Sequence, residues 1–468
     1  MLAKIATLIF FAAGASGDGL DADVKTLLKS YGNKVSFSLR EPGGGEVFNV
    51  NGSAPFAPAS VAKLVSTGCS LWTLEPQYQF ETVFGYRGKV DGETLKGDLV
   101  ISGTGDPSLV VEDLREIIEK IRHLHNIKTI QGDLVFDVSY LGSKGLEIAA
   151  GFEGDAGRSF TALLTATPMN QNSFSFWVAP DQVTGKTTRA TTLPAGVLDI
   201  KVSNKSKIGG GDGISVAYDP ASKSATISGS VEGDSEPKGL YRSVPDTYDY
   251  YQKLIQRLWK DAGGEWPKGS YKIETASVKS KVLWKHTSKT LSRILMDVNK
   301  LSLNFGAELI FLAAGAKKKG RPASYDKSMT MLSDCFSEFK VAPGTIVLNN
   351  ASGLSRDTTV QTSALTKFLN DYQQSPFGSE YLSSLSLIGM DGTAKSRLQK
   401  FAGRGRVKTG TLRDVRSIAG YLYSKARKPY SFALVFNGVS MSDPKIKALE
   451  DRIVEKILEA NLDESVKP

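Results

Sequence analysis

Two stretches near the end of the chain alternate between apolar and polar or small residues: VRSIAGYLY at 415–423 and SFALVFNGV at 431–439. This alternation is the pattern of β-strands. The segment PKIKALEDRIVEKILEA at 444–460 follows, with apolar residues at helical spacing. Its apolar stripe predicts a helix that packs on a sheet, and a weak association with a membrane surface is the alternative interpretation.

The N-terminal part of the chain shows a matching strand pattern. Residues 34–39 alternate in the manner of a half-buried strand, and 47–50 return after the Gly-rich turn 42–45. This arrangement predicts a hairpin, preceded by a helix over 21–31. We expect the hairpin and the C-terminal strands to form one antiparallel sheet with flanking helices, which is an α+β fold.

The middle of the chain has a different texture. From about residue 80 to 239 short alternating stretches are separated by Gly, Asp, Pro and Ser clusters, with one clear helix at 111–124. This pattern predicts an inserted β-rich region of one domain or two. Helical spacing then returns at 248–260, 291–314 and 325–339. The expected division is 1–17 signal peptide, 18–79 and 240–468 the two parts of a discontinuous domain, and 80–239 the insertion.

The first residues have the pattern of an export signal. A short positive region that contains Lys4 precedes a largely apolar stretch of nine residues, 5–13, and small residues follow at 13–17. The apolar run is far shorter than the ~20 residues that cross a bilayer. We therefore expect a protein without a transmembrane anchor that is exported to the periplasm or secreted.

Composition excludes several classes of protein. The 468 residues are 41% hydrophobic, which is too apolar for a disordered chain. A net charge of +9 without a long basic run argues against nucleic acid as a partner. The three histidines have no thiol or carboxylate neighbours at ligand spacing, so no metal or other cofactor is expected. Cys69 and Cys335 lie in apolar, helical segments, which favours buried free thiols over a disulfide.

A Ser-x-x-Lys pair is the first sign of chemistry. Ser60 and Lys63 are three residues apart at the expected start of a helix, so both side chains share one face. A lysine in this position can act as the base for a serine nucleophile. The same spacing also occurs at Ser235, Ser324, Ser337 and Ser442. Alone it is a weak signal, because such pairs are common on solvated surfaces.

Two further motifs distinguish Ser60 from the other serines. Ser302-Leu303-Asn304 is the only Ser-x-Asn of the chain, and Lys408-Thr409-Gly410 is the only Lys-[Ser/Thr]-Gly. The three motifs, in this order, are the set found in penicillin-binding proteins and related β-lactamases. Together they indicate a serine acyl-transfer site.

Each motif residue has an expected role in proton transfer. Ser60 attacks a carbonyl once Lys63 takes its proton, and Lys63 is a base only when it is neutral. Desolvation and the positive charge of Lys408 favour that neutral state. We expect Ser302 to pass the proton to the leaving nitrogen and Asn304 to hold a substrate amide.

The remaining residues are expected to bind the substrate. Lys408 and the Thr409 hydroxyl are placed to bind its terminal carboxylate. The backbone N–H groups of Ser60 and Thr411 form the expected oxyanion hole, where each donor contributes roughly 3 kcal/mol. The absence of a side chain at Gly410 lets the substrate lie along the strand edge.

Together these features resemble the class C penicillin-binding proteins, the D-alanyl-D-alanine carboxypeptidase/endopeptidases of bacterial cell-wall metabolism. The resemblance covers most of the chain. It is carried by the three motifs and by further segments at Ser102–Leu109, Asn350–Arg356, Gly389–Thr393 and Lys408–Val415.

The resemblance implies a penicillin-recognising transpeptidase-like core with an inserted β-rich region. It implies cleavage of D-Ala-D-Ala or D-Ala-diaminopimelate bonds in peptidoglycan stem peptides, with β-lactam antibiotics as covalent inhibitors. It also implies that Asp137 and Arg356 line the pocket for the side chain of the stem peptide. An ion pair or a turn cap is the alternative role for each.

Two alternative functions stay open on the sequence. A β-lactamase shares the motifs but must hydrolyse its acyl-enzyme quickly, and no deacylation glutamate motif is evident. A wall-binding or penicillin-sensing module would bind stem peptides without cleaving them. The presence of every motif side chain favours an enzyme.

Overall fold

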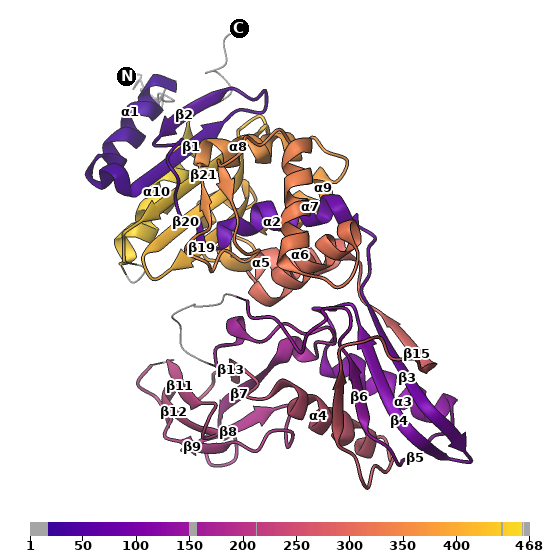
Figure 1. The fold of residues 1–468 in the computed structure, drawn as a ribbon. Coiled ribbons are helices and arrows are strands. Elements are labelled where there is room, and N and C mark those ends of the chain that lie inside the picture. Colours follow the sequence, from indigo (N-terminus) through magenta and orange to yellow (C-terminus); the bar gives the residue numbers. More distant parts are fainter. Residues whose placement is uncertain (1–16, 149–156, 212, 441–442, 461, 463–468) are drawn as a thin grey trace, which may run out of the picture. The chain divides into compact units, whose positions relative to one another are not determined.

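The computed structural model describes residues 17–148, 157–211, 213–440, 443–460 and 462. The chain forms two units. One comprises Met1–Leu64, Phe339–Val347 and Arg356–Pro468, and the other comprises Val65–Glu338 and Leu348–Ser355 (Figure 1). The first unit therefore combines both ends of the chain. Apart from Gly17, the expected signal peptide lies outside the described residues.

A six-stranded antiparallel sheet forms the centre of the first unit, in the order β18-β19-β20-β21-β1-β2. These strands span, in that order, Ser386–Leu387, Gly405–Leu412, Val415–Tyr423, Pro429–Asn437, Val35–Arg40 and Glu46–Val50. The N-terminal hairpin joins the C-terminal strands through β1 and β21, with Phe37 opposite Leu434. The structure thus confirms the α+β fold with an antiparallel sheet.

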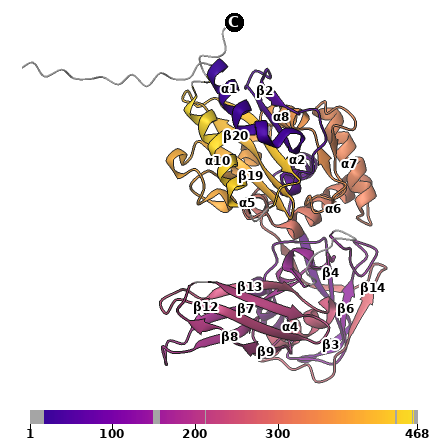
Figure 2. The same ribbon diagram turned by 90° about the vertical axis from the view of Figure 1, so that its left-hand side faces the viewer.

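Helices α1 (Gly17–Leu28) and α10 (Pro444–Glu459) cover one face of this sheet (Figure 2). Ile446, Ile453 and Ile457 of α10 are buried in one core cluster with apolar residues of the strands. The apolar stripe of the C-terminal helix therefore packs on the sheet, which is the interpretation that the spacing favoured.

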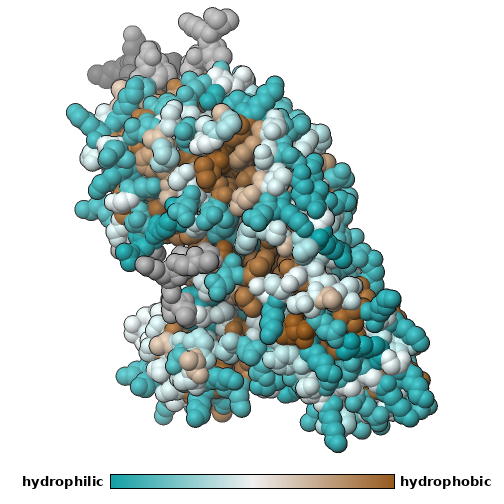
Figure 3. All heavy atoms as spheres, in the orientation of Figure 1, coloured by the Kyte–Doolittle hydropathy of each residue, from teal (hydrophilic) through white to brown (hydrophobic). Residues whose placement is uncertain are grey.

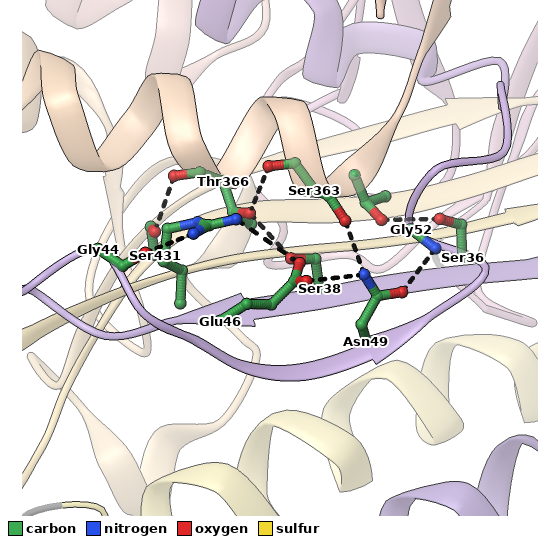
Figure 4. A network of polar contacts seen from close by, with 11 residues as sticks. Ser36, Ser38, Gly44, Glu46, Asn49, Gly52, Ser363, Thr366 and Ser431 are labelled. Atoms are coloured by element: carbon green, nitrogen blue, oxygen red, sulfur yellow. Dashed lines mark hydrogen bonds and ion pairs between the residues drawn. The ribbon is translucent and has the colours of Figure 1, made fainter. Parts of the chain in front are cut away.

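Helix α8 (Thr362–Tyr372) covers the opposite face through polar contacts (Figure 4). The hydroxyl of Ser36 lies 2.7 Å from that of Thr362, and the hydroxyl of Ser38 lies 2.9 Å from that of Thr366. Both serines are fully buried. The expectation of a half-buried strand is therefore wrong: β1 is buried on both faces, and its small hydroxyls fit there because α8 satisfies their hydrogen bonds.

The described residues of the second unit form three sheets. The largest has the order β14-β6-β4-β3-β15, with β5 beside β4. The bounds of its strands are β14 Tyr271–Glu274, β6 Leu134–Asp137, β4 Thr94–Gly103, β3 Glu81–Asp91, β15 Lys281–Thr287 and β5 Thr129–Ile130. The sheet β13-β7-β8 comprises Lys238–Ser243, Ser173–Pro180 and Thr188–Leu193. Strands β9–β12 form the third, with bounds Lys201–Asn204, Lys207–Ile208, Ile214–Asp219 and Ser224–Val231.

The inserted region continues beyond the expected boundary at Gly239. Strands β14 and β15 follow that residue, yet they pair with β6 and β3, which precede it. A boundary at 239 therefore divides a hydrogen-bonded sheet. The alternation in the sequence ends there because α4 (Thr247–Asp261) comes before the last two strands.

Helices complete both units. The second unit contains α3 (Val111–Leu124), α5 (Leu291–Lys300), α6 (Asn304–Lys319), α7 (Tyr325–Glu338) and most of α2 (Lys63–Leu74). The first contains α9 (Gly378–Ser384) and the short strands β16 (Ile346–Val347) and β17 (Thr359–Val360). The single helix expected over 291–314 is interrupted, because Ser302 adopts a left-handed backbone with φ of 61°.

Cys69 of α2 and Cys335 of α7 form a disulfide, with their Cα atoms 5.6 Å apart. The expectation of free thiols is therefore wrong. The apolar surroundings of each cysteine correctly indicate a buried sulfur. They cannot show the pairing, because 266 residues separate the two positions and the packing of the helices brings them together. A disulfide of this kind persists in an oxidising compartment.

On the face drawn in Figure 3, apolar side chains form patches that are separated by hydrophilic ones. Among the helices that the structure describes, none combines the length and the apolar character needed to cross a bilayer.

Candidate active site

Ser60 and Lys63 are in direct contact. Ser60 lies in a short 3-10 turn, Ala59–Ala62, that leads into α2, whose first residue is Lys63. The Lys63 amine donates a hydrogen bond of 2.9 Å to Ser60 Oγ. Lys63 is fully buried and Ser60 is partly exposed. A substrate can therefore reach the hydroxyl while the amine stays out of bulk water.

The Ser-x-x-Lys pair at Ser324 has a different arrangement. There the amine of Lys327 donates to the carbonyls of Gly320 and Pro322. Of the remaining three, Ser442 lies outside the described residues. The spacing alone therefore does not produce a serine–lysine contact.

Lys408 brings a second amine into the same environment. It lies in the middle of β19, is fully buried, and donates a hydrogen bond of 2.8 Å to the Thr409 carbonyl. Burial, and to a smaller extent the charge of Lys63, lowers the pKa of Lys408 well below its ordinary value. Because two charged amines repel each other away from water, the Lys63–Lys408 pair favours a state with one proton fewer.

The turn Ala59–Ala62 carries Ser60 and is called the nucleophile turn below. Strand β19 comes very close to it at Gly410. A Cβ at this position would lie 2.3 Å from Ser417 Oγ, 2.7 Å from the Pro58 carbonyl oxygen and 3.0 Å from the Ser60 nitrogen. Only glycine therefore fits between the turn and β20. This packing sets the spacing between Ser60 and the Lys-Thr-Gly strand.

The outer part of β19 is a strand edge. Strand β18 pairs with it only at Arg406 and Val407. Within the part of the chain that the structure describes, residues 409–412 therefore have no strand on that side. The Thr409 hydroxyl there donates to Thr393 Oγ1 at 2.7 Å, and the Thr411 side chain is exposed. An extended peptide can add to such an edge.

Ser302 and Asn304 belong to the second unit. Ser302 lies in the turn between α5 and α6, and Asn304 is the first residue of α6. Both side chains are partly exposed. The left-handed backbone of Ser302 places the motif at a helix start instead of inside a helix. Non-glycine residues in this conformation are uncommon and are frequent at functional sites.

The helix that starts at Asn304 holds a neighbouring loop through Glu308. This fully buried carboxylate accepts hydrogen bonds from the backbone nitrogens of Ala351 at 3.0 Å and Ser352 at 2.8 Å. The Tyr325 hydroxyl donates to it at 3.1 Å. Burial raises the pKa of Glu308. The sequence does not mark this residue as important, because a single glutamate in an apolar helix resembles a surface charge.

The two expected pocket residues lie in different units and have structural contacts. Asp137 is buried at the end of β6, and its carboxylate accepts hydrogen bonds of 2.9 Å from the backbone nitrogens of Ser139 and Val278. Arg356 forms an ion pair of 2.6 Å with Asp414, and both side chains are about half exposed. Their role in binding a stem peptide stays a prediction.

Two positions close to the nucleophile were not predicted from sequence: Ser417 and Asn437. The Ser417 hydroxyl donates to the Pro58 carbonyl at 2.7 Å, and Asn437 bonds both backbone groups of Ala57. Ser and Asn are common in strands and loops, so no sequence signal marks them. Thr393 ends the segment Gly389–Thr393 that carries part of the family resemblance, but no role was predicted for it. Among the described residues, no group of three His, Cys, Asp or Glu side chains could hold a metal ion.

The antiparallel sheet, its flanking helices and the Ser60–Lys63–Lys408 set define a penicillin-recognising serine hydrolase. The chain belongs to the D-Ala-D-Ala carboxypeptidase 3 (S13) family, whose model matches residues 38–459. As a member of this family it is a hydrolase of the D-alanyl-D-alanine carboxypeptidase type. The resemblance seen in the sequence is thus confirmed.

Two curated relatives cover most of the chain. The chain is 25% identical to D-alanyl-D-alanine carboxypeptidase DacB of Haemophilus influenzae over 91% of its own length and 89% of that protein. It is 26% identical to D-alanyl-D-alanine carboxypeptidase of Actinomadura sp. over 89% of its length and 79% of that protein.

Solved structures show the same fold. Penicillin binding protein 4 (dacB) from Haemophilus influenzae superposes with a TM-score of 0.76 at 23% identity, covering 93% of this chain and 98% of that one. The predatory endopeptidase Bd3459 from Bdellovibrio bacteriovorus, at 14% identity, gives a TM-score of 0.53 over 91% and 92% of the two chains.

Proposed function

We propose that the protein cleaves D-Ala-D-Ala and D-Ala-diaminopimelate bonds of peptidoglycan stem peptides through an acyl-enzyme on Ser60. The observation that carries the proposal is the contact of Lys63 with Ser60 beside the buried amine of Lys408. A serine hydroxyl needs a neighbouring base, and a lysine serves as one when its surroundings disfavour its charge.

In the acylation step, neutral Lys63 takes the Ser60 proton while Oγ attacks the carbonyl carbon of the penultimate D-Ala. The Ser60 and Thr411 N–H groups stabilise the resulting oxyanion. The carbon–nitrogen bond then breaks, and the leaving amine receives a proton through Ser302. Water hydrolyses the ester, which releases the shortened peptide and restores the Ser60 hydroxyl.

Substrate orientation follows from the edge of β19. The peptide adds to this edge, where Gly410 presents no side chain, and the Lys408 amine together with the Thr409 hydroxyl binds its terminal carboxylate. Asn304 holds a substrate amide, and Asp137 and Arg356 contact the stem side chain. No metal or cofactor enters this sequence of steps.

We place the enzyme in the periplasm, or outside the cell, by export through residues 1–17. The disulfide between Cys69 and Cys335 supports an oxidising compartment. β-Lactams are expected to acylate Ser60. A β-lactam complex of the Haemophilus protein and a penicillin G acylated form of Bd3459 show this kind of recognition in proteins of the same fold.

A digest of purified muropeptides tests the proposal. We expect the protein to release D-alanine from a pentapeptide monomer, to split a D-Ala-diaminopimelate cross-linked dimer, or both, as read by mass spectrometry. The ratio of the two rates measures the balance of carboxypeptidase and endopeptidase activity. Ser60→Ala is the control. Binding of either muropeptide without cleavage would contradict the proposal and favour a sensor.

Penicillin turnover separates the peptidase from a β-lactamase. We expect penicillin to leave a long-lived adduct on Ser60 that is visible in the intact mass, with deacylation slower than peptide cleavage. Turnover of penicillin as fast as cleavage of the peptide would favour a β-lactamase.

The rate of acylation should rise with pH in a range below the ordinary titration of lysine. The pKa of Lys408 is lowered by burial and by Lys63, so the amine pair loses one proton at a lower pH than two separate lysines. The base must be neutral, and acylation therefore slows as pH falls below the apparent pKa of the pair.

Lys408→Met tests the cause of this pH dependence. It removes one of two like charges, so the remaining amine keeps its proton to higher pH. The pH at which the acylation rate rises should therefore increase by about one unit. Rates with a carboxylate-bearing substrate should also fall. Stopped-flow measurements with a fluorescent penicillin from pH 5 to 10 give the acylation rate as a function of pH. If the acylation rate of the variant rose at the same pH as that of the unchanged protein, or at a lower pH, coupling of the two amines would be excluded.

A further inference from the structure

The segment that leads to Ser60 is tied to three strands, residue by residue. Phe56 exchanges two backbone hydrogen bonds with Val360 in β17, at 3.0 and 2.8 Å. The Ala57 nitrogen donates to Asn437 Oδ1 at 2.9 Å, and Asn437 Nδ2 donates to the Ala57 carbonyl at 3.0 Å. The Pro58 carbonyl accepts from Ser417 Oγ at 2.7 Å. Each backbone polar group of residues 56–58 therefore has a partner.

The next residue has an unfavourable backbone conformation. Ala59 adopts φ of 49°, in the left-handed region where its Cβ is crowded, and it is buried. Ala59 immediately precedes the nucleophile. Strained residues of this kind persist when the surrounding structure holds them in place, and they are concentrated at active sites. The bonds to residues 57 and 58 are the contacts immediately before the strained residue.

Asn437 is well placed to hold the backbone just before Ala59. It is the last residue of β21, paired with Val415 of β20, so the sheet fixes its backbone. Its amide makes a donor and an acceptor bond to a single residue, Ala57, in the way that a neighbouring strand would. A hydroxyl or a carboxylate offers only part of this pattern. The two bonds of this side chain thus continue the hydrogen-bonding pattern of the sheet by one residue toward the nucleophile turn.

We propose that Asn437 is a positioning residue for acylation: its two bonds to Ala57, together with the Ser417 bond to Pro58, hold Ala59 in the left-handed conformation and so keep Ser60 Oγ on the Lys63 amine. The side-chain amide of Asn437 bonds to Ala57 and acts on Ser60 through the turn. The proposal deepens the proposed function and rests on Ser60 as the nucleophile.

Asn437→Ala should lower the first-order acylation rate constant by about 10- to 100-fold, because small misplacements of a reacting atom are sufficient for such losses. The dissociation constant for the noncovalent penicillin complex should change by less than about threefold. Stopped-flow measurements over a range of fluorescent penicillin concentrations separate the two constants. Asn437→Asp, which keeps an acceptor for the Ala57 nitrogen, should give an intermediate rate constant.

Asn51→Ala is the matched control. Asn51 also makes two side-chain bonds to the backbone of the same unit, donating to the carbonyls of Gly32 and Val35. Both variants should lower the unfolding temperature, but only the change at Asn437 should lower the acylation rate constant of folded protein. Equal rate constants for the two variants would overturn the proposal.

A second change tests the strained turn directly. Glycine adopts the left-handed region without a Cβ penalty. Adding Ala59→Gly to Asn437→Ala should therefore restore the acylation rate constant severalfold, and no recovery would overturn the link to Ala59. Ser60→Ala in the same assay distinguishes the two proposals, since retained acylation there would refute the nucleophile itself.

Discussion

Ser60→Ala is expected to abolish acylation by penicillin completely, because the ester to Oγ cannot form without that oxygen. The intact mass after incubation should show no adduct. Ser324→Ala is the matched control, since Ser324 has the same Ser-x-x-Lys spacing but its lysine donates to the carbonyls of Gly320 and Pro322. It should acylate like the unchanged protein.

Lys63→Ala should leave the nucleophile in place but without its base. Loss of general-base catalysis typically lowers a rate about 10²- to 10⁴-fold. The adduct should therefore form slowly, if at all, in hours of incubation. An adduct on the Ser60→Ala protein, or acylation of Lys63→Ala at the unchanged rate, would refute the assigned chemistry.

Gly410→Ala is also expected to slow acylation strongly, through packing instead of chemistry. A methyl group at this position meets the Pro58 carbonyl and the Ser60 nitrogen, both backbone atoms, so the nucleophile turn or β19 must move. We expect acylation to fall by about 100-fold or more. Overpacking of a close contact also lowers the free energy of unfolding by about 1–3 kcal/mol. Acylation kinetics and thermal unfolding measure the two effects.

Gly43→Ala provides the comparison for that change. Gly43 lies in the same unit, and the nearest atom to an added Cβ is a carboxylate oxygen of Glu41 at 3.9 Å. The Gly43 variant should keep its acylation rate and stability. If Gly410→Ala also kept its acylation rate and stability, the close packing of β19 against the nucleophile turn would not be needed for acylation.

Local patterns were sufficient for several elements of the fold. The strand expected at 415–423 is β20 with the same limits, and the helix expected at 111–124 is α3. The apolar spacing of α3 marks one helical face, and in β20 a run of apolar and small residues is bounded on both sides by polar ones. The helix expected at 444–460 differs from α10 by one residue.

Longer-range features were beyond such patterns. The alternation in β1 indicated one polar face, but the helix that covers Ser36 and Ser38 comes more than 300 residues later. The break at Ser302 lies in an unbroken helical spacing, because a left-handed residue leaves no trace in apolar periodicity. The partner of Cys69 depended on how two distant helices pack.

By itself the sequence determined the family and the residue types of the chemistry, because a serine, a lysine three residues later and a Lys-Thr-Gly strand together form the motif set of penicillin-binding proteins and related β-lactamases. The tertiary structure alone decided how the nucleophile is held. The close approach at Gly410, the neighbouring buried amines of Lys63 and Lys408, and the Asn437 bonds to Ala57 all join residues hundreds of positions apart. Contacts of this kind depend on packing between elements, which local sequence patterns do not encode.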